Sequence, residues 1–177
     1  MFAKSTKTLI TAVAVTLVLL ATPSTASAGA EDLSTARAAT ARFHQLEAAN
    51  VAGYNILVRD LAGLACIENP GVGVMGIHYV NGGLLFDGAV NAATPEALVY
   101  QQLPNGKLHL VAVEYIVFYG MWAKSSPPSL FGQQFKLIAK PNRYGLDAFY
   151  ELHAWVWKDN PDGMFKDWNP RGACAPF

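Results

Sequence analysis

Charged residues are scarce in this sequence of 177 residues. They make up only 15% of the chain, and 13 basic side chains balance 13 acidic ones. A protein that binds nucleic acid through bulk charge needs a basic excess, so this composition predicts no nucleic-acid partner. At 52%, hydrophobic residues are too frequent for an intrinsically disordered chain. The 15 glycines and 10 prolines are typical of a loop-rich globular protein rather than of a helical bundle.

Long hydrophobic runs are rare as well. The longest, Leu9–Ala21, follows two lysines and precedes Ala26-Ser27-Ala28, small residues in the pattern of a signal-peptidase site. It is shorter than the roughly 20 residues that span a bilayer. We predict a secretory signal peptide over residues 1–28 and a secreted, extracellular protein without membrane contact after its removal. Residues 29–177 are expected to form a single globular domain.

Only two cysteines are present, Cys66 and Cys174. Outside the cell an even number of cysteines favours a disulfide, which would pin the end of the chain to an early part of the domain. The alternative is two buried, unpaired thiols. The wide spacing excludes a CxxC redox site and a cysteine-rich zinc site.

Motifs that define a reaction are missing. No GxSxG segment marks a nucleophilic serine. Gly71–Gly76 fits GxGxxG by its letters, but it precedes a predicted strand instead of joining a strand to a helix, so we regard it as a chance match. Paired carboxylates for glycoside hydrolysis could come from Glu96, Glu114 and Glu151, with strand alternation as their only support.

The hydrophobic periodicity changes along the chain. From Asp32 to Gly53, apolar residues recur at spacings of three and four and predict one amphipathic helix. After Leu64 the period is two, which predicts strands. The expected strands are Leu64–Ile67, Met75–Val80, Ala97–Leu103, Leu108–Phe118 and Phe149–Trp157. We therefore expect an α+β fold, with an N-terminal amphipathic helix packed on a curved antiparallel β-sheet or partial barrel. The segment before the last strand is rich in Pro and Gly and is expected to be a functional loop.

The clearest local signal is a β-hairpin with Asn105-Gly106 at the centre of a two-residue turn. The register set by this turn places Ala97 opposite Glu114. It also places Glu114 on one face with Leu108 and Leu110. A lone carboxylate among apolar neighbours is costly to bury as an ion, so we expect Glu114 to have a partner.

Four histidines are the candidate partners. His44 is expected at the boundary of the helix, and His109 near the hairpin turn in solvent. His78 and His153 differ from them because each lies within an apolar strand. By alternation, His153 shares a face with Glu151, Trp155 and Trp157.

His78, Glu114 and His153 could meet on one face of the sheet, since neighbouring strands lie about 5 Å apart. Two imidazoles and one carboxylate make a mononuclear site for one divalent transition metal: zinc, iron, copper, nickel or manganese. Protons are expected to compete with the metal as the pH falls toward the histidine range near 6.5. The alternative is a hydrogen-bonded Glu–His network in the core, with no metal and no other cofactor.

Three functions follow from these residues. The first is metal binding, in a metal-dependent enzyme or a metal carrier. The second is a non-catalytic module that binds a small apolar or aromatic molecule in a pocket lined by Tyr79, Trp155 and Trp157. The third is an assembly protein whose aromatic strand faces form a homo-oligomer. The expected partner is thus a metal ion, a small molecule or a second copy of the chain.

Several segments together resemble a known family. They include Gly76-Ile-His-Tyr79, Val113-Glu-Tyr115, Leu152–Trp157 and Asn160–Pro170. They resemble small exported bacterial proteins, largely actinobacterial, over about residues 36 to 174. The resemblance implies a secreted single domain and adds no activity and no catalytic residue.

Overall fold

The computed structural model describes Met1 and residues 25–174, with side chains from Gly29 onward. Its helices are α1 (Thr25–Thr40), α2 (Leu46–Val51) and α3 (Gly82–Leu85), with 3₁₀ turns η1 (Ala41–His44) and η2 (Tyr119–Met121). The predicted signal peptide lies largely outside the described residues. No described helix has both the length and the apolar character needed to cross a membrane.

The predicted single helix is broken, and this part of the prediction is wrong. α1 is followed by η1, and Gln45 is extended, with φ −92° and ψ 108°, before α2 begins. One reason lies in the sheet: the Tyr100 hydroxyl donates to the Phe43 carbonyl at 2.7 Å. Since Phe43 is also buried in the core, the chain bends here to follow the surface of the sheet.

The strands form one mostly antiparallel sheet, which confirms the α+β class. Its seven strands are β1 (Tyr54–Leu57), β2 (Cys66–Asn69), β3 (Gly73–Asn81), β4 (Ala97–Gln102), β5 (Leu108–Phe118), β8 (Lys136–Ile138) and β9 (Phe149–Ala154). Their order is β1-β3-β4-β5-β9-β8, and β2 also pairs with β3. In the described part of the chain the sheet stays open and does not close into a barrel.

The segment expected to be a loop carries three short strands. β6 (Ser129–Leu130) and β7 (Gln133–Gln134) pair with each other, and β8 adds to the main sheet beside β9. β1 was not expected either. These strands have two to four residues, which is too short for alternation to be recognised.

The hairpin between β4 and β5 is confirmed, but its turn differs from the prediction. Leu103 accepts a hydrogen bond from the Gly106 amide at 2.9 Å, so the turn is centred on Pro104-Asn105. Gly106 follows the turn with φ 80°, a conformation that glycine adopts without strain. The predicted two-residue turn is wrong because proline suits the first central position of a four-residue turn.

A β-bulge then restores the predicted register. Val111 has no partner in β4, because the strand pairing shifts by one residue on either side of it. Ala97 therefore pairs with Glu114 as predicted. The bulge also reverses the faces along β5, so Leu110 and Leu108 pack in the core on the other side of the sheet from Glu114. Their predicted place beside Glu114 is wrong.

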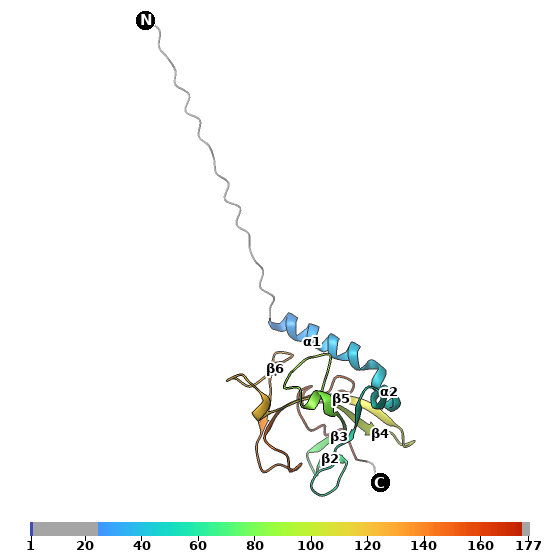
Figure 1. Ribbon diagram of the computed structural model, residues 1–177. Helices are drawn as coiled ribbons and strands as arrows, with labels where there is room; N and C mark the ends of the chain where they lie inside the picture. Colours follow the sequence, from blue (N-terminus) through green and yellow to red (C-terminus); the bar gives the residue numbers. More distant parts are fainter. Residues whose placement is uncertain (2–24, 175–177) are drawn as a thin grey trace.

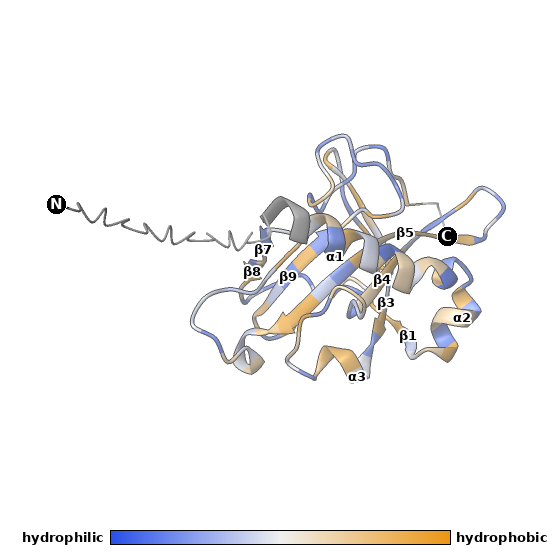
Figure 2. Ribbon diagram, turned by 90° about the horizontal axis from the view of Figure 1, so that it is seen from above, coloured by the Kyte–Doolittle hydropathy of each residue, from blue (hydrophilic) through white to orange (hydrophobic). Residues whose placement is uncertain are grey.

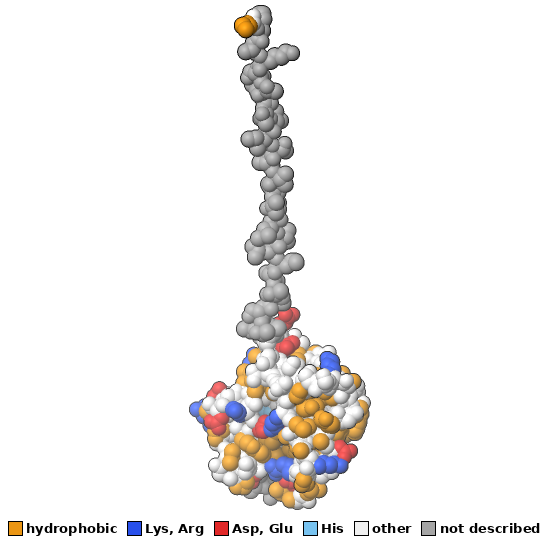
Figure 3. All heavy atoms as spheres, turned by 90° about the vertical axis from the view of Figure 1, so that its left-hand side faces the viewer, with side chains coloured by type: hydrophobic (Ala, Val, Ile, Leu, Met, Phe, Trp, Pro, Cys, Tyr) orange, Lys and Arg blue, Asp and Glu red, His pale blue; other side chains and the backbone are white. Residues whose placement is uncertain are grey.

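The two faces of the sheet are covered differently. We call the side packed against the N-terminal helices the helix-covered face; its core includes Ala36, Phe43, Leu98, Tyr100, Val113 and Tyr115. Figures 1 and 2 show α1 lying across this side of the central strands. The opposite side is the site face, which carries His78, Val99, Ala112, Glu114, Glu151, His153 and Trp155. Hydrophobic side chains also gather on the molecular surface, with charged groups between them (Figure 3).

The C-terminal segment, Asn160–Cys174, is fastened at both ends. The Asn160 side-chain amide donates to the Lys166 and Trp168 carbonyls at 3.2 and 3.0 Å. At the other end the sulfur atoms of Cys66 and Cys174 lie at disulfide distance, with Cα atoms 5.8 Å apart, as predicted. The segment therefore has a defined path and brings residues from the end of the chain onto the site face.

Candidate metal centre

Three strands bring His78, Glu114 and His153 together. His153 on β9 pairs directly with Glu114 on β5, while His78 lies on β3, beyond β4. The β4 residue opposite Glu114 is Ala97, whose small side chain leaves space across the sheet. His78 Nε2 lies 3.4 Å from Glu114 Oε2, and one ligand atom from each of the three residues lies within 4.8 Å of the others.

All three side chains are buried, and the histidines lack hydrogen bonds. The exposed fractions are 2% for His78, 4% for Glu114 and 1% for His153. Neither ring nitrogen of either histidine has a hydrogen-bond partner among the described residues. Buried polar groups are nearly always paired, and each unpaired one costs about 1–3 kcal/mol. The described residues supply no partner for any of these four nitrogens.

Burial holds both imidazoles in the neutral form. It lowers the pKa of His78 to about 4, partly offset by a polar contact with the Gly76 backbone that falls short of hydrogen-bond geometry. Burial also lowers the pKa of His153 well below its ordinary value, and the charges of His78 and Lys136 act in the same direction. Neutral imidazole is the form that binds metals, so both rings stay ready to bind at pH values well below 6.5.

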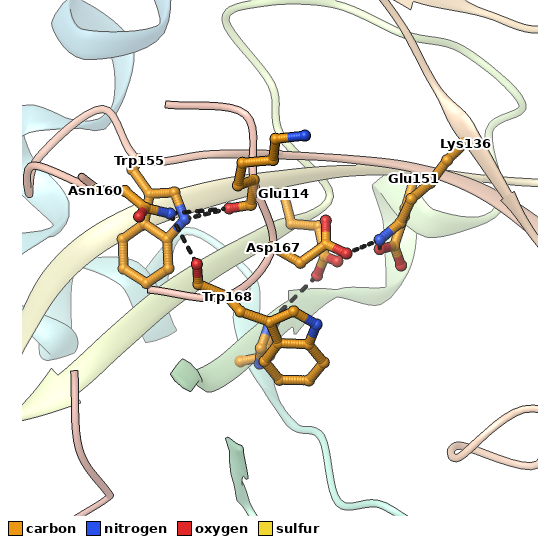
Figure 4. Close-up of polar contacts among 9 residues, drawn as sticks. Glu114, Lys136, Glu151, Trp155, Asn160, Asp167 and Trp168 are labelled. Atoms are coloured by element: carbon orange, nitrogen blue, oxygen red, sulfur yellow. Dashed lines mark hydrogen bonds and ion pairs between the residues drawn. The ribbon is translucent and has the colours of Figure 1, made fainter. Parts of the chain in front are cut away.

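Glu114 lacks a cation of its own. Burial, and then the negative charge of Glu151, raise the pKa of Glu114 well above its ordinary value, while Lys136 acts in the opposite direction. Lys136 is already paired with Glu151 at 2.7 Å and with Asp167 (Figure 4). When ionised, the three carboxylates outnumber the single ammonium by two charges, and a divalent cation would balance that excess.

The distances can be compared with those in a metal site. Two ligand atoms at about 2.0–2.1 Å from a tetrahedral metal lie about 3.4 Å apart. The separation of 3.4 Å between His78 Nε2 and Glu114 Oε2 fits this value. The ligand atoms of the trio lie up to 4.8 Å apart, so the side chains would have to close by up to about 1.4 Å around an ion. Three protein ligands leave a fourth position for water or a substrate.

A cavity of about 210 Å³ opens beside His78 and Glu114. These two residues form its polar end, together with Tyr144, and Arg59 also lines it. The remaining walls are apolar and include Ile56, Val58, Val80, Leu85, Ile116 and Phe149. Any position on a metal that faced the cavity would therefore be reached through an apolar pocket.

The predicted ligand-binding residues do not share this cavity. Tyr79 lies on the helix-covered face, against Tyr100, with ring centres 5.6 Å apart. Trp155 lies on the site face beside His153, with ring centres 4.8 Å apart. Trp157 lies on the opposite side from Trp155 and packs against the main core, so its predicted face is wrong.

The reason for the position of Trp157 is the end of β9. The strand stops at Ala154, and the chain turns, with the Val156 amide donating to the Ala154 carbonyl at 2.9 Å. Alternation no longer applies beyond this turn. The Trp157 indole then donates to the Thr40 hydroxyl at 3.1 Å.

Three residues near the site were not found by the sequence reasoning: Lys136, Tyr144 and Asp167. Lys136 and Tyr144 belong to the breaker-rich segment that we expected to be functional, so composition indicated the region but not the residues. Asp167 belongs to the C-terminal segment, whose Asn160–Pro170 motif was noted only for its family resemblance. None of the three lies in a strand long enough for its face to be assigned.

No protein-family model, curated protein or solved structure matches the chain. The resemblance to exported bacterial proteins therefore stays a prediction. The assignment of the site depends on its geometry.

Proposed function

We propose that the protein binds one divalent transition metal through His78, Glu114 and His153. The observation that carries this proposal is the group of four unpartnered, buried imidazole nitrogens next to a buried carboxylate. Zinc, iron, copper, nickel and manganese all accept this ligand set. The metal would supply the missing partner for each ring and the missing cation for Glu114.

The geometry favours this function over a metal-free core network. A network would satisfy the ring nitrogens through hydrogen bonds to Glu114 or to the backbone. The single close approach, between His78 and Glu114, lacks hydrogen-bond geometry, and both rings are left unpaired within the described residues. Since a half-satisfied network is less stable than an apolar core, the three polar residues need another explanation.

The cavity favours a metal-dependent enzyme over a metal carrier. A carrier needs a closed ligand shell or a route for the ion, whereas a metal-dependent enzyme needs a position where a substrate can reach the metal. The cavity beside His78 and Glu114 offers such a position. We also infer export from the cell, supported by the predicted signal peptide and by the pairing of Cys66 with Cys174.

Metal titration of the purified full chain, stripped with a chelator, tests the proposal. Zinc, iron, copper, nickel and manganese are added in turn while thermal unfolding and calorimetric heat are recorded. A metal at 100 times its Kd stabilises the folded state by about 2.7 kcal/mol. Elemental analysis of the protein from its native host then identifies the ion that is bound there.

The chain provides matched controls for this experiment. His78→Ala and His153→Ala should each remove most of the binding. His44→Ala and His109→Ala should leave it nearly unchanged, because these two rings lie together elsewhere, with centres 4.8 Å apart. Equal loss in all four variants, or no stabilisation of the wild type by any of the metals, contradicts the proposal.

A further inference from the structure

We propose that the cavity beside the metal centre takes a small apolar carboxylate, with a single ring or a short chain, and that its carboxylate group binds the metal. This inference rests on the proposed metal site and names its substrate class. Three features of the cavity support it: its size, its apolar walls and the charges at its polar end.

The size of the cavity limits the ligand. Its volume is about 210 Å³. An apolar cavity of about 150 Å³ in another protein holds a benzene molecule. The additional space is enough for one substituent on a ring, or for a short alkyl chain, and a longer ligand would extend through the open side.

The walls of the cavity determine the body of the ligand. Val58, Val80 and Leu85 contribute to a lining that is apolar apart from its polar end. Ile56 and Leu146 also line the cavity while remaining 49% and 42% exposed, so they mark its open side. A molecule that enters there buries apolar surface, and a sugar or a peptide would lose its hydrogen bonds to water.

The polar end determines the head group. The ion and its three ligands, two neutral imidazoles and one carboxylate, carry one net positive charge, which attracts an anionic oxygen. The further charges of Lys136, Glu151 and Asp167 do not line the cavity. Burial and the charge of Glu114 raise the pKa of Tyr144, so its phenol stays protonated and can donate to such an oxygen. Arg59 adds a positive group to the lining, and its guanidinium donates to the Gly63 carbonyl at 2.8 Å.

Benzoate and benzamide form a matched pair of probes, because they share shape but differ in charge. We expect calorimetry to show that benzoate binds the zinc-loaded full chain at least about tenfold more tightly than it binds the metal-free chain. We expect benzamide to bind the zinc-loaded chain at least about tenfold more weakly than benzoate does.

Two substitutions locate the binding. Leu85→Trp fills the cavity and should abolish benzoate binding while zinc binding is kept. Leu103→Trp places the same side chain in the hairpin loop, where Leu103 is 41% exposed, and should change neither. Tyr144→Phe removes only the hydroxyl group and should weaken benzoate binding severalfold without changing zinc affinity.

The outcomes separate this inference from the proposed function. Zinc binding without benzoate binding overturns the carboxylate ligand and leaves the metal site in place. Benzoate binding that is equal with and without zinc overturns the role of the metal in holding it. Benzoate binding that survives Leu85→Trp places the ligand outside the cavity and overturns the inference as well. Failure of zinc and the other metals to bind overturns both proposals.

Discussion

Two groups of buried polar side chains, one on each face of the sheet, differ in their hydrogen bonds. On the helix-covered face, the hydroxyl groups of Tyr54, Tyr100 and Tyr115 each donate to a backbone carbonyl at 2.7–2.9 Å. On the site face, the four ring nitrogens of His78 and His153 have no such partner within the described residues. Both faces are equally well buried, so exposure to water does not explain the difference.

The difference separates buried polar groups that stabilise the fold from groups for which the described residues provide no partner. The tyrosines tie loops and helices to the sheet, and their hydrogen bonds form within the chain. Each unpaired histidine nitrogen lowers the folding stability by about 1–3 kcal/mol, and no interaction within the described residues offsets this loss. Residues that reduce the stability of the isolated chain are common at binding sites.

The largest expected effect comes from the disulfide, which ties the end of the C-terminal segment to the core of the helix-covered face. Cys66 packs in the core of the helix-covered face, and Cys174 ends the segment that carries Asp167 to the site. Replacing both cysteines by alanine should lower the free energy of unfolding by about 2–4 kcal/mol and weaken zinc binding as well. Urea unfolding and zinc calorimetry measure the two effects. If the double alanine variant unfolds at a lower urea concentration but binds zinc with unchanged affinity, the C-terminal segment does not support the site.

Glu96 should make the free energy of unfolding depend on pH. Its carboxylate accepts a hydrogen bond from the Ile116 amide at 2.8 Å, but burial dominates and raises its pKa from 4.5 to about 8. In this range the folded chain keeps a proton that the unfolded chain releases. Stability should therefore fall as the pH rises from about 4.5 to about 8, by at most about 1.4 kcal/mol per pH unit.

Glu96→Gln should reduce this pH dependence, as measured by urea unfolding at several pH values. Glu31→Gln is the control, because Glu31 is exposed at the start of the described chain. A pH profile that is the same in the wild type and in Glu96→Gln would show that Glu96 is not the group responsible.

Proton release on metal binding tests the site face. The raised pKa of Glu114 and the lowered pKa values of His78 and His153 mean that zinc displaces a proton from the carboxylate and not from the imidazoles. Zinc affinity should fall about tenfold per pH unit below the pKa of Glu114. This replaces the expectation that the histidines compete for protons near pH 6.5.

Calorimetry in buffers of different ionisation enthalpy counts the released protons. The Glu114→Gln variant should bind zinc more weakly and release no protons on binding. The Glu31→Gln variant should behave as the wild type does. Release of two protons near pH 6.5 would point to the histidines and contradict the assignment to Glu114.

The smallest expected effect compares single groups on the two faces. Tyr100→Phe leaves the Phe43 carbonyl unpaired and should cost about 1 kcal/mol of folding free energy. His153→Leu replaces an unpaired polar ring with an apolar group, so in a chelator it should cost nothing or stabilise the chain. Urea unfolding without metal measures both changes. A loss in His153→Leu as large as that in Tyr100→Phe would show that His153 is satisfied in solution.

The sequence was sufficient to predict the strands that carry the site. His78, Glu114 and His153 each lie in a strand of six or more residues, where alternation is readable. The pairing of Ala97 with Glu114 was also predicted correctly, although the turn and the bulge at Val111 each shift the register by one residue. The two shifts cancel, and a local pattern contains no sign of either.

Other features depended on contacts that no local pattern records. The break between α1 and α2 coincides with a hydrogen bond from Tyr100 to Phe43, which are far apart in the chain. Trp157 lies on the face opposite to the predicted one because β9 ends at Ala154. Lys136 reaches the site from an edge strand of three residues, and its partner Asp167 comes from the C-terminal segment.

The sequence by itself determined that His78, Glu114 and His153 would be buried and which two cysteines could pair, because burial in a strand follows from its neighbours in the chain. It could not determine that His78, Glu114 and His153 meet, since their strands are separated by long stretches of sequence and several strand orders within a sheet fit the same pattern. The tertiary structure decided this by placing β3, β4, β5 and β9 side by side, with Ala97 opposite Glu114. It also decided that the imidazoles stay unpaired, because no group among the described residues meets their ring nitrogens with hydrogen-bond geometry.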